Sequence, residues 1–129
     1  MMSETQLKLG VIGQGYAVCR LAPKADVPSW ADSSALLSIT RTPDELSIVC
    51  TETNVPTGVR AERGWAVLKV LGPLEFSLVG ILSSLTQPLA KAGIPVFVIS
   101  TFDTDYLLVK QTSLPETVDV LGRFCEVMT

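Results

Sequence analysis

Two carboxylates in the second half of the chain offer its most specific chemistry. Asp103 and Asp105 stand two residues apart in the run Ser-Thr-Phe-Asp-Thr-Asp at 100–105. On a strand both side chains would face the same side of the sheet, whereas in a turn they need not. The pair fits a hard-cation site, although Mg²⁺ and Ca²⁺ normally require more carboxylates. It also fits a hairpin turn in which Asp and Thr bond to local backbone, or a site where Asp105 holds a ligand ammonium by a charge-assisted hydrogen bond.

A second candidate is the segment Gly-Pro-Leu-Glu-Phe at 72–76. A Gly-Pro turn that leads from a strand into a helix leaves backbone N–H groups pointing past the helix start. The helix dipole favours an anion there, such as the α-carboxylate of a ligand. The same residues also fit an ordinary tight turn, so the segment alone does not decide between binding and structure.

The residues on which most enzymes depend are missing. The chain has no histidine, which removes the usual general base, the Ser-His and Cys-His nucleophile systems and the commonest transition-metal ligand. All three cysteines stand in apolar contexts typical of inert core thiols. The Gly-x-Gly at 13–15 lacks a following helix, which argues against dinucleotide binding. We therefore expect no enzyme, metal or cofactor; catalysis would have to use a lysine or carboxylates such as Glu75, Asp103 and Asp105.

Composition and charge exclude several other classes of protein. Of the 129 residues 47% are apolar and 18% charged, which favours a folded chain with apolar surface to spare for an oligomer interface. The ten basic residues are scattered and the net charge is −3, so nucleic-acid binding is not expected. No apolar run approaches a membrane span, and the N-terminus lacks the features of a signal peptide. Three widely spaced cysteines favour reduced thiols, and hence a cytoplasmic protein.

Two blocks of the chain repeat in the same order. Gly-Tyr-Ala-Val-Cys-Arg-Leu at 15–21 matches Gly-Trp-Ala-Val-Leu-Lys-Val at 64–70, and both patterns predict strands. A second match pairs 39–49 with 99–109, each a strand, a short polar turn with an acidic residue, and another strand. The repeat predicts two units, residues 1–62 and 63–129.

The second unit is predicted to run strand, helix, strand, strand, helix, with a short last strand. Apolar residues follow helical spacing over 74–92, and Gly93 is a suitable stop. The nearly continuous apolar run at 94–101 predicts a strand buried on both faces. Ser113 and Glu116 have the spacing of a capping box at the start of the last helix. This order is the split βαβ, ferredoxin-like arrangement.

The first unit has no room for such helices. Residues 23–34 fit only a turn or so, and 54–63 predict a loop that feeds the next strand. The expected fold class is therefore α+β, with two tandem ferredoxin-like (βαββαβ) units of which the N-terminal one is abbreviated.

A family resemblance is carried by GPLEFSLVGILSSLTQPLAKAGIPVFVISTFDTDYLLV at 72–109. This stretch resembles the ACT domain in the form found in tandem-ACT proteins, which include small aspartokinase-regulatory-like proteins and the cytosolic arginine sensors. The likeness is strong over about 63–125 and weaker, though colinear, over the first half. It implies that both units are ACT units, the first degenerate, and that the second binds a small effector, most often a free amino acid.

The resemblance also implies a ligand site, carried over position by position. In similar proteins the loop after the first strand and the first helical turn form the ligand wall. That wall would here be Glu75, Phe76, Leu78, Val79, Gly80 and Ile81. Gly80 would let a ligand or a neighbouring backbone approach closely. Asp105 would hold the ligand ammonium, with Thr101 and Phe102 adding backbone and packing contacts.

The same resemblance implies a homodimer. Pro95 and Val96 would belong to the strand edge that pairs with a second ACT unit and closes its pocket. Isologous pairing would give two equivalent sites, one per chain. The sequence thus predicts a small-molecule-binding regulatory protein that reports an amino acid to a protein partner. The alternative is an ACT-fold interaction or scaffold module that no longer binds an effector.

Overall fold

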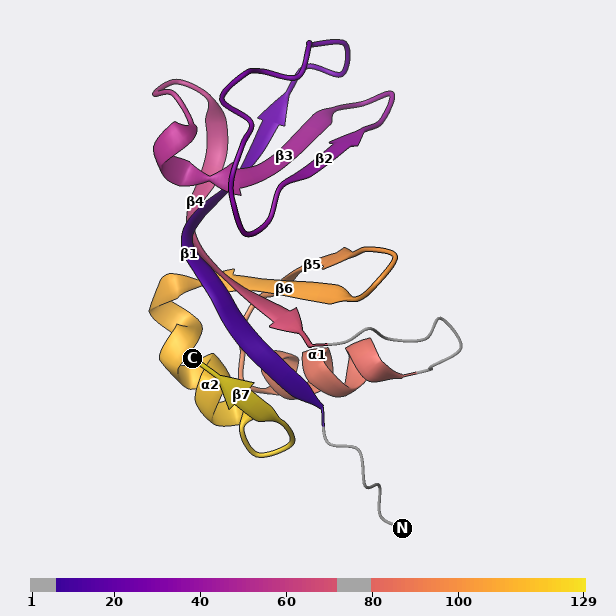
Figure 1. The fold of residues 1–129 in the computed structure, drawn as a ribbon, viewed down its shortest axis with the longest axis vertical. Coiled ribbons are helices and arrows are strands. Elements are labelled where there is room, and N and C mark those ends of the chain that lie inside the picture. The colour runs from indigo at the N-terminus through magenta and orange to yellow at the C-terminus, as the bar shows by residue number, and fades with distance from the viewer. Residues whose placement is uncertain (1–6, 72–79) are drawn as a thin grey trace. The chain divides into compact units, whose positions relative to one another are not determined.

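The chain forms two compact units in a computed structural model that describes residues 7–71 and 80–129. The first, called here the N-terminal unit, is Gly13–Trp65. The second, the C-terminal unit, joins the chain up to Ile12 with Ala66–Thr129. Two long strands, β1 (Lys8–Leu21) and β4 (Arg60–Val70), contribute to both units (Figure 1). The start of β1 therefore has its contacts with the C-terminal half of the chain, although the sequence repeat assigns it to the first half.

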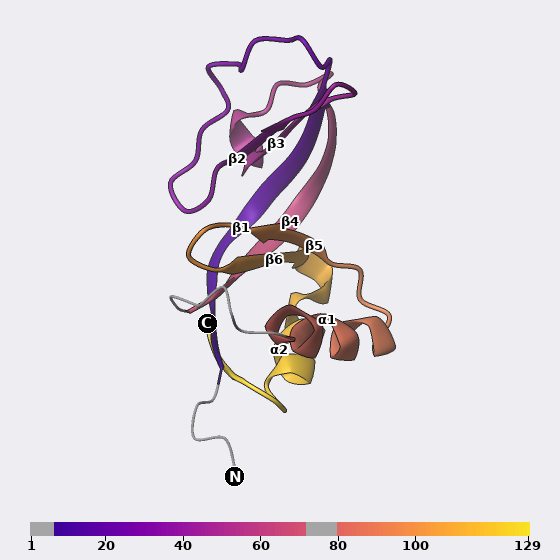
Figure 2. The ribbon, with the colours of Figure 1, turned by 90° about the vertical axis from the view of Figure 1, so that its right-hand side faces the viewer.

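The C-terminal unit has the predicted ferredoxin-like order of elements. After β4 it contains α1 (Ile81–Lys91), β5 (Phe97–Ser100), β6 (Asp105–Lys110), the 3₁₀ turn η2 (Gln111–Ser113), α2 (Leu114–Leu121) and β7 (Glu126–Met128). The strand order is β7-β1-β4-β6-β5, and both helices cover one face of this sheet (Figure 2). The last strand pairs in parallel with β1, Lys8 opposite Glu126, so the start of β1 lies between β7 and β4.

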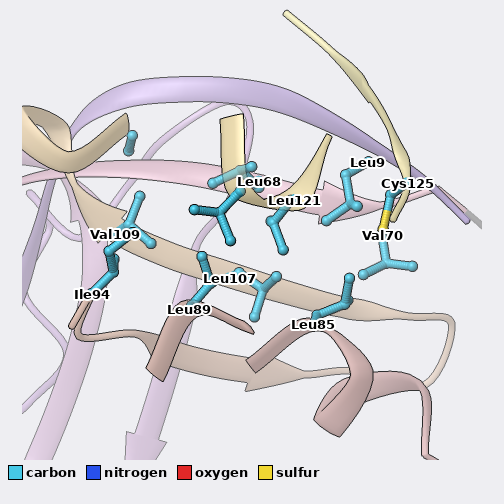
Figure 3. Close-up of a cluster of buried hydrophobic side chains, with 12 residues drawn as sticks. Leu9, Leu68, Val70, Leu85, Leu89, Ile94, Leu107, Val109, Leu121 and Cys125 are labelled. Carbon is cyan, nitrogen blue, oxygen red and sulfur yellow. The ribbon is translucent and has the colours of Figure 1, made fainter. Parts of the chain in front are cut away.

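The core of the C-terminal unit lies between the sheet and the two helices (Figure 3). Strand β4 contributes every second residue and α1 contributes positions four apart, the two periods that place side chains on one face. The buried members are Leu9, Ala66, Leu68, Val70, Leu85, Leu89, Ile94, Leu107, Val109, Val120, Leu121 and Cys125. Because all of them are apolar, their burial supplies the main stabilisation of the unit.

Of the helix predicted over 74–92, positions 74–79 lie outside the described residues. In the part that the structure describes, α1 begins at Ile81, directly after Gly80, whose φ of 84° lies in the left-handed region. Its end is as predicted: Gly93 has a φ of 75° and its N–H donates to the carbonyl of Ala90 at 3.0 Å. The N–H of Ile94 donates to the carbonyl of Leu89 at 2.9 Å, which completes a Schellman motif.

Helix α2 begins where the sequence predicts, but without the capping box. Ser113 is the N-cap residue and makes no side-chain cap bond. Instead the Thr117 hydroxyl donates to the carbonyl of Ser113 at 2.8 Å. Pro115 lies in the first turn, where its missing N–H costs little.

The N-terminal unit is a sheet with no α-helix over Gly13–Trp65, all of which the structure describes. Here β2 (Ser38–Arg41) pairs antiparallel with β3 (Leu46–Thr51), and β3 pairs antiparallel with β1. A 3₁₀ turn, η1 (Glu52–Asn54), follows β3. The buried apolar cluster of this unit is Ala17, Cys19, Leu46, Ile48, Cys50 and Val55. The absence of α-helices here confirms the loop expected at 23–34, whereas the loop expected over 54–63 is wrong at its end, because β4 already begins at Arg60.

Arginine side chains hold the loops that stand in for helices in the N-terminal unit. The Arg41 guanidinium donates to the carbonyls of Pro23 and Ala25. The Arg63 guanidinium donates to the carbonyl of Glu52 at 3.1 Å and to that of Val55 at 3.3 Å. One side chain thus satisfies several loop carbonyls that regular secondary structure would otherwise pair.

Neither helix in the part of the chain that the structure describes has the length and apolar character that a membrane span requires.

The left-handed glycine at the end of α1 makes a testable prediction. A Cβ at Gly93 would meet no atom of the described residues within 4 Å, so Gly93→Ala tests backbone strain. We expect a loss of about 1–2 kcal/mol in the free energy of unfolding, measured by urea denaturation. Gly10→Ala is the matched control, because its Cβ would contact only the Leu71 side chain, at 3.5 Å and beyond. An equal loss in both variants would contradict a conformational role for Gly93.

Candidate functional site

The turn between β5 and β6 is closed by threonine. The N–H of Thr101 donates to the carbonyl of Thr104 at 2.8 Å, and the Thr101 hydroxyl donates to the same carbonyl at 3.0 Å. The turn therefore joins the last ladder pair, Ser100 opposite Asp105. These local bonds confirm the hairpin-turn interpretation of this segment. They also engage the N–H of Thr101, which leaves only its carbonyl for the predicted backbone contact to a ligand.

Thr104 attaches this turn to the neighbouring strand. Its side chain is buried, 4% exposed, and its hydroxyl donates to the carbonyl of Val70 at 2.6 Å. Val70 is the last residue of β4, so the turn and the end of β4 lie at the same end of the C-terminal unit (Figures 1 and 2). Sequence reasoning did not single out Thr104. A buried threonine in a polar turn has no local signal, because its acceptor is 34 residues away along the chain.

The two carboxylates of the turn have different surroundings. Asp103 is exposed, whereas Asp105 is partly buried at the start of β6. The Asp105 Oδ1 atom accepts a 2.5 Å hydrogen bond from the Ser100 hydroxyl. That bond fixes the carboxylate on the strand while its remaining lone pairs keep acceptor capacity. Within 7–71 and 80–129 no three His, Cys, Asp or Glu residues are grouped so that they could hold a metal ion.

The predicted ligand wall is described only in part. Glu75, Phe76, Leu78 and Val79 lie outside the described residues. Gly80 precedes α1, and its carbonyl accepts from the Ser84 N–H at 2.9 Å. Among the described residues, a Cβ at Gly80 would meet only the Ser83 hydroxyl, at 4.0 Å. Ile81 is partly buried at the start of the helix, where the first N–H groups have no acceptor within the helix.

The remaining predicted residues lie just before and just after β5. Val96 packs against the core of the C-terminal unit, and Pro95 is exposed. They precede β5, whereas Thr101 and Phe102 follow it, so the two groups are separated by roughly 16 Å of extended chain. Phe102 is 80% exposed. One chain therefore brings Thr101–Asp105 to the end of β4 but places Pro95 and Val96 at the other end of β5.

Strand β5 itself differs from the prediction. It covers Phe97–Ser100 rather than 94–101, and its apolar residues are half-buried rather than buried on both faces. The reason is its position: β5 is the outermost strand of the C-terminal sheet and pairs with β6. An edge strand has one row of backbone N–H and C=O groups facing away from its sheet.

The cysteines are all buried and free, as the apolar context of each predicts. Burial raises the pKa of the Cys19 thiol to about 11, with the neighbouring Cys50 as the second cause. Burial likewise raises the pKa of Cys50 and of Cys125. A thiol with a raised pKa is protonated at neutral pH and is a poor nucleophile. These side chains therefore belong to the packing of the two units and not to a reactive site.

A βαββαβ order with two helices on one face of the sheet defines a ferredoxin-like domain, here of the ACT class. A family model described as ACT domain matches residues 60–123, and a second, described as an N-terminal domain, matches 14–58. Residues 60–123 of the chain therefore belong to the ACT-domain family. An Agrobacterium tumefaciens protein of known crystal structure is 41% identical to this chain in sequence. The two structures have a TM-score of 0.89, and the match covers 96% of this chain and 93% of that chain.

Further matches are to two curated arginine sensors and to one solved structure that shares the fold alone. The cytosolic arginine sensor for mTORC1 subunit 1 from Homo sapiens is 37% identical over 60 residues, and the Bos taurus protein equally so. This match covers 46% of this chain but spans only 18% of the length of either sensor. The regulatory subunit of aspartate kinase from Thermus thermophilus shares the fold, with a TM-score of 0.58 over 90% of this chain and 99% of that chain at 11% identity.

The raised pKa of Cys19 predicts a pH dependence of stability. Between its ordinary value of 9.0 and about 11 the unfolded chain loses the thiol proton while the folded chain keeps it. The free energy of unfolding should therefore fall as pH rises through this window, and the contribution is fully present below it. Urea denaturation from about pH 8 to about pH 11 measures the slope, which Cys19→Ala should make shallower. Ser47→Ala, on the paired strand, should leave the slope unchanged; equal slopes in all three proteins would contradict the prediction.

Proposed function

We propose that this protein binds a free amino acid between paired ACT units and regulates a protein partner in response. The observation that carries the proposal is the β5–β6 turn. Thr104 fixes it to the end of β4, and Ser100 orients the Asp105 carboxylate. Family membership supports the proposal, as does the relationship to a protein named as a cytosolic arginine sensor.

The chemistry of the proposed site matches a zwitterion. Asp105 accepts the ligand ammonium, and a charge-assisted hydrogen bond of this kind is about twice as strong as a neutral one. The first turn of α1, beginning at Ile81, offers backbone N–H groups and the positive end of the helix dipole to the ligand carboxylate. Glu75, Phe76, Leu78, Val79 and Gly80 complete the wall. Thr101 and Phe102 line the opposite side, and neither a cofactor nor a metal takes part.

The second half of the pocket comes from another copy of the chain. Pro95 and Val96 lie too far along β5 to reach the turn of their own chain, but pairing through the β5 edge would bring a partner's residues there. An open edge strand accepts a second strand by main-chain hydrogen bonds. In this proposal the protein is a cytoplasmic homodimer without catalytic activity. Ligand binding acts by favouring one arrangement of the dimer over another.

The first test is a thermal-shift screen of the twenty amino acids. At 100 times its Kd a ligand adds about 2.7 kcal/mol of stability, enough to raise the melting temperature by several degrees. Asp105→Asn keeps an acceptor for Ser100 but loses the charge, so the ligand affinity should fall about tenfold or more.

The matched control for the screen is Asp103→Asn, on the exposed part of the same turn, which should bind like the natural chain. Unchanged affinity in Asp105→Asn would place the ligand elsewhere. No response to any amino acid from a confirmed dimer would instead favour the scaffold alternative, which the helix-free N-terminal unit also fits.

Dimer formation makes a separate prediction. Sedimentation equilibrium should give a mass near twice 13.8 kDa. Ile99→Lys places a charge on β5, a substitution by which natural edge strands avoid pairing, and should yield monomers. Ile39→Lys makes the same change on β2, the edge strand of the N-terminal unit, and should leave the dimer intact. If both variants stay dimeric, the proposed β5 interface is wrong.

A further inference from the structure

The outer surface of the C-terminal unit contains a groove between its two helices. The groove has a volume of about 540 Å³ and is formed by α1 from Ser84 onward and by the end of α2 with the residues after it. Its apolar lining includes Pro88, Ala92, Val120 and Phe124. Ser84 lies in the first turn of α1, where the amino-acid site is proposed, but the other described lining residues lie beyond that turn, so the groove extends away from the proposed site.

One large aromatic side chain lies in this groove without being buried. Phe124 is 58% exposed, although the N–H of Phe124 is fixed by the Leu121 carbonyl at 3.0 Å. The neighbouring Cys125 is buried in the core and holds the backbone on its other side. The ring is therefore presented to solvent by an ordered stretch of chain. Aromatic residues, Phe included, are enriched at protein–protein interfaces relative to the rest of a protein surface.

The charge at the groove is positive in a chain that is acidic overall. Lys91 and Arg123 both line it, and among the residues that the structure describes no Asp or Glu does, whereas the whole chain has a net charge of −3. Arg123 donates one hydrogen bond to Asp119 at 2.9 Å, and both side chains are largely exposed. A guanidinium has five N–H donors, so Arg123 keeps capacity for a second carboxylate. The groove is thus complementary to an acidic partner.

The geometry points to an acidic amphipathic helix of another protein as the occupant of this groove, and we propose that the groove is its docking site. A groove between two helices offers side chains rather than a row of unpaired backbone groups, which favours a helix over a strand. The partner's apolar stripe would contact Phe124 and Val120, and its carboxylates would pair with Lys91 and Arg123. A second copy of this chain is disfavoured, because an isologous contact would bring the cationic residues of both copies together.

The test selects peptides that bind the purified protein from a phage-displayed library of random peptides. The protein is used in the oligomeric state in which it purifies. Selected peptides should combine apolar residues at helical spacing with flanking Asp or Glu. A synthetic copy of the best peptide is then titrated by fluorescence anisotropy. Its affinity should fall at least about tenfold in the Lys91→Glu/Arg123→Glu variant, and severalfold in Phe124→Ala and on raising the salt concentration.

The matched control is Lys24→Glu/Arg60→Glu, an equal charge reversal at exposed positions of the N-terminal unit, which should leave the affinity unchanged. The melting temperature of each variant shows that it is folded. Selected peptides without acidic residues, or binding that survives the reversal in the groove, would overturn the proposal. It would also be overturned if the groove variants lost self-association instead, since the occupant would then be a second copy. Because no amino acid is added, the result is independent of the proposed ligand site.

Discussion

The buried face of β4 is the constraint on which the rest of the C-terminal unit depends. Ala66, Leu68 and Val70 alternate along the strand and are all fully buried. Lys69 points to the other face, where its ammonium lies 6.0 Å from the centre of the Tyr106 ring. Because side chains alternate with a period of two, a shift of β4 by one residue would bring Lys69 into the apolar core between the sheet and the helices. The positions of both helices and of the hairpin turn depend on their contacts with β4 in this register.

Local patterns were sufficient where the physical cause was itself local. The end of α1 was predictable because only glycine readily adopts the left-handed conformation found at Gly93. The absence of helices from the first half followed from Pro and Gly spacing. The polar hairpin at 100–105 followed from its turn residues, and family resemblance added the ACT class, which the fold and the family model bear out.

Patterns failed where distant contacts decided the outcome. The pairing of β1 with β7 has no signal in the repeat. It depends on the packing of Leu9 in the same core as residues more than fifty positions away along the chain. For the candidate site, sequence located the turn but could not find the buried bond of Thr104 to β4.

Helix α1 connects the two proposed surfaces, and its packing limits how they could communicate. Its first turn borders the proposed amino-acid site, and its last turn lines the groove with Lys91 and Ala92. Leu85 and Leu89, four residues apart and fully buried, hold the helix to the sheet between these ends. Close-packed interiors have low compressibility and transmit strain. A ligand could therefore change the groove only by shifting α1 against α2, and only to the extent that it binds the two arrangements with different affinity. Coupling between the surfaces is thus a property of the α1–α2 contact, and not of the residues that touch the ligand.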